Sequence, residues 1–327
     1  MLDWNYIQQQ SDNKCLKPKN GSDFKILSID GGGIRGIFAA KYLAMIEEET
    51  GIPINKYFDL VTGTSTGGII ALGITAGIPM KEIVDLYVNN ASSIFDNKII
   101  KKIPILKRPI IFLKNLYDNK QLKKILKEEF GDRKIIDAET LLCIPSLEYN
   151  TSRPKVYKTP HSKNFYYDKD IEMWKVALAT SAAPLYFPPA TDDGCKLDGG
   201  LWANNPILVG ITEALSFDVN KENIKVLSIG TGEKVYKNKP GIFKRGGLFA
   251  WNTNIIDIVM NAQSYSAENI SKYLIEPQNI TRINFNGSSN LELDNINQEN
   301  LKYLEVQGKD AFLKSYKKNE CVEEKFF

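Results

Sequence analysis

The fold of this chain is best predicted from one segment, Asp59-Leu-Val-Thr-Gly-Thr-Ser65-Thr-Gly-Gly-Ile-Ile-Ala-Leu-Gly73. Residues 58–61 are apolar enough for a short buried strand, and residues 68–76 are apolar enough for a buried helix. Between them, Gly63-Thr-Ser65-Thr-Gly67 predicts a sharp turn with a serine at its centre. A strand, a tight turn and a helix in this order form a nucleophile elbow, which lifts the serine hydroxyl above the sheet.

The same segment predicts a favourable place for negative charge beside Ser65. A helix that starts at the turn points its first amides and the positive end of its dipole toward the serine. An oxyanion that forms during attack on an ester would be stabilised there. Taken alone, this segment could also be an ordinary strand-to-helix turn, so its interpretation depends on the rest of the chain.

Composition narrows the class of protein. The 327 residues include 43% hydrophobic residues and carry a net charge of +3, so the chain can bury a large core and its overall charge favours no partner. Four cysteines lie far apart without a Cys-x-x-Cys pair, which indicates a reducing compartment and no zinc site. The N-terminal residues lack the apolar run of a secretory signal, and no apolar run is long enough to span a bilayer. We therefore expect a cytoplasmic protein that needs no metal.

Strands alternate with helices along most of the chain. Strands are expected at residues 24–30, 57–61, 141–149, 155–159, 195–198, 224–229 and 280–285. Helices are expected at residues 37–49, 68–76, 81–91, 172–180, 205–217, 254–274 and 298–318. This order predicts a three-layer α/β/α fold with a mainly parallel central sheet. No linker divides the chain, so we expect one domain over residues 24–318, preceded by a loose polar arm over residues 1–23.

A second glycine-rich loop, Asp30-Gly-Gly-Gly-Ile-Arg-Gly36, follows the first expected strand. It contains the Gly-x-Gly-x-x-Gly spacing of dinucleotide-binding loops, but that interpretation needs an acidic residue at the end of the second strand. Asp59 lies at the start of its strand, which is the opposite edge of the sheet. The alternatives are a plain turn or an oxyanion hole, in which three glycines offer unobstructed amides and Arg35 holds the loop or an anionic head group.

Ser65 needs a base, because a serine hydroxyl is a weak nucleophile until a neighbour accepts its proton. The chain has one histidine, and the order Ser65, Asp137, His161 matches the triad of α/β-hydrolases. However, His161 lies in a polar stretch that we expect to be a surface loop. Asp198 is the other candidate, at the end of a short extended segment and before two glycines, where it could be a base or simply a turn former.

Three ordered motifs, GGGIRG, GTSTG and DGG, resemble those of the patatin-like phospholipase family. The flanking runs ILSIDGGGIRG, FDLVTGTSTGGIIALG, ATSAAPLYFPP, KLDGGLWANNP and VLSIGTGE are similar to the family as well. The resemblance covers residues 24–232, and it weakens over residues 96–140 and after residue 233. It implies a patatin-like fold and a Ser-Asp dyad, which removes the need for a histidine.

By matching positions, the resemblance implies that Ser65 is the nucleophile and Asp198 its base. The expected oxyanion hole consists of Gly31, Gly32, Gly33 and Arg35, together with Thr66. The other glycines of the motifs are Gly36, Gly63, Gly67, Gly199 and Gly200. The activity implied is hydrolysis of carboxylic esters of membrane lipids, of phospholipase A or lysophospholipase type, without a metal or organic cofactor.

Other functions are compatible with the same residues. The dyad could serve a thioesterase or an acyltransferase, or the fold could be a non-catalytic module that binds lipid or nucleotide. Bacterial members of the family include antiviral effectors that cyclic nucleotides activate. This short chain without a secretory signal is compatible with such an effector, although no residue identifies a nucleotide pocket.

Residues 96–127 alternate lysine and arginine with isoleucine, leucine and phenylalanine. Such an insertion suits contact with anionic lipid, as a lid or as a peripheral attachment to the inner membrane surface. Alternatively, it packs its apolar residues inward and leaves its lysines in solvent. Aromatic residues are sparse in this segment, so we expect no nucleic acid partner.

Overall fold

The structure, a computed structural model, describes residues 2–12, 17–19, 21–95, 115–234, 254–287, 291–316 and 322–327. The strands of its central sheet are β1 (Phe24–Ile29), β2 (Leu60–Gly63), β3 (Leu141–Glu148), β4 (Arg153–Lys158), β5 (Lys196–Asp198), β6 (Ile224–Ile229) and β8 (Ile280–Ile283). The order across this 7-stranded sheet is β4-β3-β2-β1-β6-β8, and β5 pairs with β3. Strands β3, β2, β1, β6 and β8 run parallel, whereas β4 and β5 run antiparallel to β3.

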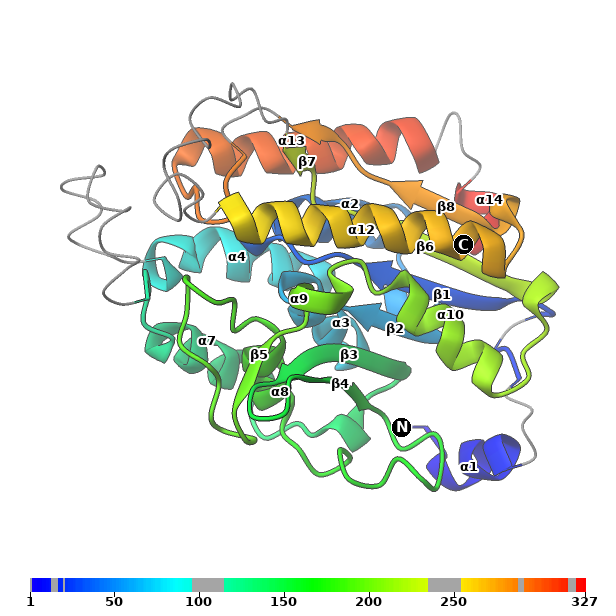
Figure 1. Ribbon diagram of the computed structural model, residues 1–327. Helices are drawn as coiled ribbons and strands as arrows, with labels where there is room; N and C mark the ends of the chain where they lie inside the picture. The colour runs from blue at the N-terminus through cyan, green and yellow to red at the C-terminus, as the bar shows by residue number, and fades with distance from the viewer. Residues whose placement is uncertain are drawn as a thin grey trace.

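Helices cover both faces of the sheet, so the expected three-layer α/β/α fold is confirmed (Figure 1). The longer helices are α1 (Trp4–Asp12), α2 (Gly36–Thr50), α3 (Thr66–Thr75), α4 (Met80–Ile94), α7 (Lys120–Phe130), α8 (Met173–Thr180), α10 (Ile207–Ser216), α12 (Asn254–Leu274) and α13 (Gln298–Lys314). Shorter elements are α9 (Gly200–Ala203), α14 (Val322–Phe326), and the paired strands β7 (Glu233–Lys234) and β9 (Asn286–Gly287). Among the helices of the described ranges, none combines the length and the apolar character needed to cross a bilayer.

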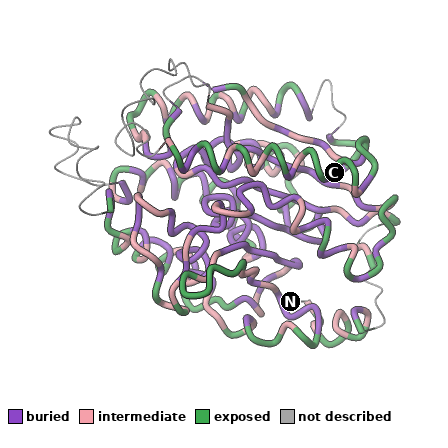
Figure 2. The backbone as a smooth tube through the Cα atoms, viewed as in Figure 1, coloured by how far each residue is buried: buried purple, intermediate pink, exposed green. Residues whose placement is uncertain are grey.

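Two hydrophobic cores lie on either side of the sheet. Successive residues of a strand point to opposite faces. In β1, therefore, Phe24 and Ile26 pack in the core beneath α10, while Leu27 and Ile29 pack in the larger core beneath α2, α3 and α4. Figure 2 shows the consequence, since the sheet is buried along most of its length and the exposed backbone lies on the outer helices and loops.

Strands β1 (FKILSI) and β6 (IKVLSI) have similar sequences and are neighbours in the sheet. They pair in parallel and residue by residue, so that Ser28 lies opposite Ser228 and Ile29 opposite Ile229. Both strands are buried on both faces, as apolar runs in a parallel sheet require. Their carboxyl ends therefore deliver two glycine loops to the same edge of the sheet.

The N-terminal residues differ from the loose arm that their polarity suggests, because they contain helix α1. Its Trp4 and Ile7 pack against the core beneath α10. The indole N–H of Trp4 donates to the carbonyl of Ile136 (2.8 Å), and the Gln8 amide donates to the carbonyl of Pro160 (2.7 Å). Two apolar side chains one turn apart are enough to dock an otherwise polar helix.

Only part of the basic insertion can be compared with expectation, since residues 96–114 lie outside the described residues. The described remainder contains α7, whose apolar side chains, including Leu122 and Leu126, are buried. On its outer side, the Lys127 ammonium lies over the Trp174 ring, 4.3 Å from the ring centre. This part of the segment thus follows the alternative in which apolar residues pack inward.

His161 is fully buried, which contradicts the expectation of a surface loop. Its ring packs edge-on against Phe165 and Phe217. One ring nitrogen is 2.9 Å from the Thr159 hydroxyl and the other is 2.9 Å from the Glu213 carboxylate on α10. The polar sequence around it misled the prediction, because the end of the β3–β4 hairpin folds back onto α10 and encloses the ring.

The charge of Glu213 is predicted to stabilise the folded protein at neutral pH and to stabilise it less in acid. Burial alone would raise the pKa of this carboxyl, but hydrogen bonds and charges from His161 and Lys158 hold the pKa below its ordinary value. A carboxyl whose pKa is depressed in the folded state stabilises it above its unfolded pKa, about 4.3, and loses this effect as the pH falls further. We expect Glu213→Gln to lower the free energy of unfolding by about 1–3 kcal/mol at pH 7, and by less in acid.

Urea unfolding at several pH values tests this expectation. Glu128→Gln is the matched control, since Glu128 lies on α7 with 65% of its side chain exposed. An equal loss of stability at neutral and acid pH would show that the Glu213 charge is not responsible.

Candidate active site

Ser65 occupies the predicted elbow between β2 and α3. Its backbone has φ 55° and ψ −122°, a left-handed conformation that costs energy for any residue other than glycine. The turn is tight on both sides. A Cβ on Gly63 would lie 2.0 Å from the carbonyl oxygen of Gly67, and a Cβ on Gly67 would lie 2.3 Å from that of Ile29. These two positions therefore need glycine because backbones meet there.

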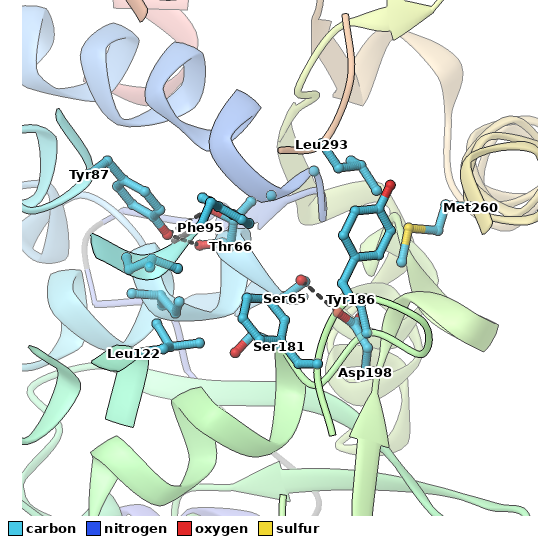
Figure 3. Close-up of a pocket in the computed structure, with 16 residues that line it drawn as sticks. Ser65, Thr66, Tyr87, Phe95, Leu122, Ser181, Tyr186, Asp198, Met260 and Leu293 are labelled. Atoms are coloured by element: carbon cyan, nitrogen blue, oxygen red, sulfur yellow. Dashed lines mark hydrogen bonds between the residues drawn. The ribbon is translucent and has the colours of Figure 1, made fainter. Parts of the chain in front are cut away.

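The sheet register brings Asp198 to this serine. β4 covers one edge of β3, so β2 and β5 share the other edge: β2 pairs with residues 141–143 and β5 with residues 146–148. β5 thus begins pairing where β2 has turned away into the elbow. As a result, the Ser65 hydroxyl donates to Oδ2 of Asp198 at 2.7 Å (Figure 3).

Glycines also hold Asp198 in place. Its second carboxylate oxygen accepts the N–H of Gly200 at 2.6 Å. A Cβ on Gly199 would lie 2.3 Å from the carbonyl oxygen of Pro145, so this glycine allows the chain to pass close to β3. Sequence reasoning could not separate a base from a turn former at Asp198, and the structure shows that the same turn aims its carboxylate at Ser65.

The environment of Asp198 favours proton transfer near neutral pH. Its side chain is fully buried, and this desolvation raises the pKa to about 7, although the Gly200 N–H and the Ser65 hydroxyl act in the opposite direction. Desolvation dominates because an ionised carboxylate loses its water shell. A carboxyl with such a pKa can accept a proton and return it at physiological pH.

The Gly31–Gly33 loop, expected from the sequence to form an oxyanion hole, contributes Gly32 and Gly33 to the same pocket as Ser65 and Asp198. The N–H of Gly31 already donates to the carbonyl of Asn204 at 2.9 Å, so Gly31 is not available as a donor. Gly32 and Gly33 line the pocket, and among the described residues no acceptor is found for either N–H. Thr66 also lines it, and its amide, first in α3, has no acceptor within the helix.

Arg35 and Gly36 support this loop from outside the pocket. Arg35 is buried, and both its backbone N–H and its Nε donate to the carbonyl of Gly32 (3.1 and 3.2 Å). It therefore holds the loop, which is one of the two roles considered for it, and it is not among the residues that line the pocket. Gly36 lets α2 approach the elbow, because a Cβ there would lie 2.2 Å from the Thr66 hydroxyl.

The pocket above Ser65 is mostly apolar and opens to solvent. In Figure 3, Tyr87, Phe95 and Leu122 lie on one side of the Ser65–Asp198 pair, and Tyr186, Met260 and Leu293 lie on the other. The walls are contributed by Gly32, Gly33, Ser65, Thr66, Ile69, Tyr87, Ile94, Phe95, Leu122, Ser181, Ala183, Tyr186, Phe187, Asp198, Met260 and Leu293. An apolar cavity with a few polar atoms at its floor suits a hydrophobic chain that carries one reactive polar group.

The alternative residues do not reach this site. Asp137 accepts the backbone N–H of Lys134 at 2.8 Å and closes its own turn, while His161 is engaged by Glu213. Asp59, considered for dinucleotide binding, accepts the backbone N–H groups of Lys19 and Lys25 at the amino end of β2. Within the described ranges, no group of three or more His, Cys, Asp or Glu residues could hold a metal ion.

Three supporting residues were not predicted. Thr180 accepts the N–H of Ser65 at 3.0 Å and fixes the elbow backbone. The Thr231 hydroxyl donates to the carbonyl of Gly31 at 2.8 Å, and a side-chain N–H of Asn204 lies 3.4 Å from the same oxygen. All three lie in runs that resemble the family, but their sequence alone gives no sign of these contacts.

A serine at a strand–helix elbow that donates to a buried aspartate defines a site of the serine hydrolase class, with a carboxylate where others use histidine. Comparison with known proteins specifies the class further. The family model for patatin-like phospholipase matches residues 27–211, and the chain belongs to this family.

Curated relatives agree with this assignment. The chain is 37% identical over 251 residues to a cGAMP-activated phospholipase of Pseudomonas aeruginosa, with 76% of this chain and 74% of the relative covered. It is 33% identical over 333 residues to a cGAMP-activated phospholipase of Vibrio cholerae, with 92% and 94% covered. It is also 30% identical over 302 residues to Patatin-like protein 1 of Arabidopsis thaliana, with 78% and 72% covered.

The raised pKa of Asp198 predicts how the reactivity of Ser65 depends on pH. The serine is activated only when Asp198 is ionised, so covalent labelling by a fluorophosphonate should accelerate about tenfold per pH unit below pH 7 and level off above it. Stopped labelling reactions between about pH 5 and 9, with folding checked by circular dichroism, measure this profile. A rate independent of pH across this range would contradict Asp198 as the base. The variant Asp198→Asn should be labelled slowly, at a rate that does not rise between acid and neutral pH.

Proposed function

We propose that this chain is a lipid acyl hydrolase of the phospholipase A or lysophospholipase type, with Ser65 as nucleophile and Asp198 as its base. The observation that carries the proposal is the 2.7 Å hydrogen bond between the two side chains at the floor of a mostly apolar pocket. Membership of the patatin-like phospholipase family supports it. An ester of a long acyl chain fits such a pocket, because the chain is desolvated while the carbonyl meets the polar floor.

Acylation follows from this geometry. Oδ2 of Asp198 accepts the Ser65 proton as Oγ attacks the ester carbonyl carbon. The carbonyl oxygen becomes an oxyanion, and the amides of Gly32, Gly33 and Thr66, three residues that line the pocket, are the donors we assign to it. When the tetrahedral intermediate collapses, Asp198 returns the proton to the departing alcohol, and the acyl group remains on Ser65.

Deacylation repeats these steps with water. Asp198, again ionised, accepts a proton from the water that attacks the acyl-serine, and then returns it to the Ser65 oxygen. Throughout the cycle, Oδ1 stays bonded to the Gly200 N–H, so the carboxylate turns little between the two half-reactions. This sequence of proton transfers uses no metal or organic cofactor.

Removal of either member of the dyad should abolish turnover. We expect Ser65→Ala and Asp198→Asn each to lower the hydrolysis of fluorogenic phospholipids about 1,000-fold or more, because one supplies the attacking oxygen and the other the base. Release of free fatty acid is the measurement, and unchanged melting temperatures show that the fold is retained. His161→Asn is the control, since it alters a buried side chain outside the pocket and should keep measurable activity.

Product analysis separates this proposal from its alternatives. A thioesterase would prefer acyl thioesters to phospholipids, and an acyltransferase would pass the acyl group to an added alcohol rather than to water. A non-catalytic module would leave lipids intact and would not be labelled by a fluorophosphonate at Ser65. Wild-type protein that hydrolyses no lipid ester while remaining folded would contradict the proposed function.

We also propose that a cyclic dinucleotide activates this hydrolase, as in an antiviral effector. The support is that relatives from three bacterial species, matched over 76–92% of this chain, are cGAMP-activated phospholipases. We expect hydrolysis to rise about 5- to 150-fold when cGAMP is added, the usual range of coupling between two sites. Linear dinucleotide is the control, and equal activity with and without cGAMP, at concentrations that saturate binding, would contradict the regulation.

The lipid substrate suggests where the enzyme acts. We propose that it works from the cytoplasm as a peripheral protein at the inner membrane surface, since its substrate is embedded there and no described helix could cross the bilayer. Sedimentation with vesicles of bacterial lipid composition during the hydrolysis assay tests this location. Protein found only in the supernatant while lipid is hydrolysed would contradict stable attachment.

A further inference from the structure

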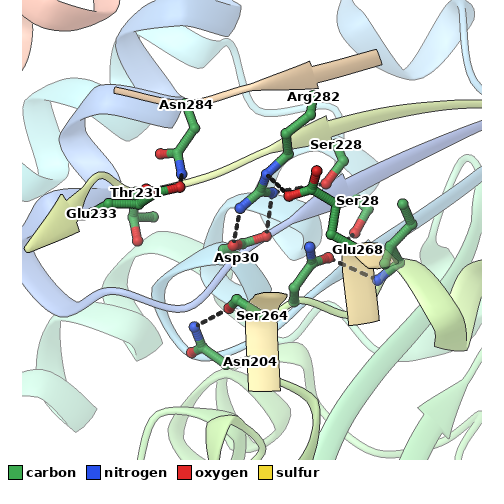
Figure 4. A network of polar contacts seen from close by, with 12 residues as sticks. Ser28, Asp30, Asn204, Ser228, Thr231, Glu233, Ser264, Glu268, Arg282 and Asn284 are labelled. Atoms are coloured by element: carbon green, nitrogen blue, oxygen red, sulfur yellow. Dashed lines mark hydrogen bonds and ion pairs between the residues drawn. The ribbon is translucent and has the colours of Figure 1, made fainter. Parts of the chain in front are cut away.

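A buried ion pair lies directly behind the glycine loop. Arg282 on β8 reaches across β6 to Asp30, the residue between β1 and Gly31, and binds it through two hydrogen bonds of 2.8 and 2.6 Å (Figure 4). Nη1 also donates to the Ser228 hydroxyl on β6 at 2.8 Å. Only 16% of the arginine side chain and 4% of the aspartate side chain are exposed, so this contact is shielded from competing water.

The backbone of Asp30 and Gly31 is also held by hydrogen bonds. The backbone N–H of Asp30 donates to Ile229 at 2.9 Å. The carbonyl of Gly31 accepts the Thr231 hydroxyl at 2.8 Å and faces an N–H of Asn204 at 3.4 Å. Asn204 is itself held by Ser264 on α12, at 3.0 Å. Thr231, Asn204 and Ser264, which make these contacts, are not among the residues that line the pocket.

The geometry of the peptide bond relates these hydrogen bonds to the direction of the next N–H groups in the loop. In a trans peptide, the carbonyl of one residue and the N–H of the next point in opposite directions. The carbonyl of Gly31 is drawn toward Thr231, so the N–H of Gly32 points away from Thr231, and Gly32 is one of the residues that line the pocket. Likewise, Arg35 draws the carbonyl of Gly32 and thereby directs the N–H of Gly33.

We propose that Asp30, Arg282 and Thr231 form a loop clamp, and that Arg282 is a positioning residue which orients the oxyanion-hole amides without touching substrate. The clamp rests on the proposed function, because it matters only if those amides stabilise an oxyanion. Arg282 and Thr231 both lie beyond residues 27–211, so the part of the chain matched by the family model does not contain them. A well-directed donor is worth far more than one that must reorient during the reaction.

The charges around Arg282 explain why its loss should disturb the loop. Glu268 lies 3.8 Å from Nε, and Asp30 lies on the other side of the same guanidinium. Without the cation, Asp30 would lose both of its hydrogen bonds to the guanidinium and would still feel the charge of Glu268, so it would move or take up a proton. Either change loosens the residue to which Gly31 is joined.

Three variants test the clamp. Arg282→Met removes the cation, Asp30→Asn with Arg282→Met removes the whole pair, and Thr231→Val removes one hydroxyl with little change of shape. We expect kcat on a fluorogenic phospholipid to fall about tenfold or more in each, with KM within about twofold, because only transition-state stabilisation is lost. Fluorophosphonate labelling of Ser65 should slow in parallel, since the phosphonyl oxygen occupies the same hole.

Melting temperatures show whether Arg282 positions the loop or only stabilises the folded protein. Arg282→Met leaves an unpaired buried charge and should melt earlier, whereas the double variant should regain much of this loss because no lone charge remains. If the clamp is real, kcat stays low in the double variant although its stability recovers. Glu213→Gln is the matched control, because it breaks a buried ion pair near α10 and should lower the melting temperature while kcat is kept.

Two outcomes would overturn the proposal: recovery of kcat together with melting temperature in the double variant, or wild-type turnover by Thr231→Val. If Arg282→Met does not fold, the kcat of Thr231→Val still tests the clamp. If wild-type protein hydrolyses no lipid, the proposed function fails, and the labelling rates of wild type and Thr231→Val still decide the clamp. Equal labelling rates for these two proteins would show that Thr231 does not orient the loop.

Discussion

The hydrogen bond between Ser65 and Asp198 joins two residues that are 133 positions apart in the chain. Its short length requires two unrelated turns to end at one point. β3 supplies that point, since β2 and β5 share one of its edges in succession. The same arrangement buries the aspartate completely, and burial is what raises its pKa into the range where it can exchange protons at neutral pH. Position and basicity of this carboxylate thus have one structural origin.

The other half of the site depends on the opposite end of the sheet. The glycine loop follows β1, but the groups that hold it come from the segment after β6, from β8, and from the segment between β5 and α10. Ser65 and the glycine loop therefore follow different strands, β2 and β1, and the parallel pairing of these strands aligns them. A rigid parallel sheet suits this purpose, because its carboxyl ends present loops side by side at one edge.

The sequence predicted the parts of this molecule whose chemistry is local. The elbow around Ser65 and the strand-and-helix order could be read because glycine spacing and apolar runs report backbone geometry directly. The environment of His161 could not, since what buries it is a helix more than 50 residues away in the chain, with Glu213 as its partner. The contacts of Trp4 with Ile136 and of Arg282 with Asp30 could not be predicted for the same reason, because each joins distant segments of the chain.

Two residues of the expected oxyanion hole make contacts that the sequence could not indicate. Gly31 belongs to the loop as predicted, yet its amide is already used by Asn204, and Arg35 supports the loop instead of facing the pocket. A motif indicates which residues meet at a site. It does not indicate which of their polar groups remain free, because that depends on neighbours contributed by other motifs.

The backbone of Ser65 has a consequence for how such an enzyme can change over time. At φ 55°, glycine would be more comfortable than serine, so the chemistry is retained against a local preference of the chain. A lineage that no longer needed catalysis could gain stability by losing the nucleophile. Replacing this serine by glycine would relieve the strained backbone and at the same time remove the hydroxyl bonded to Asp198, so local stability and this contact oppose each other.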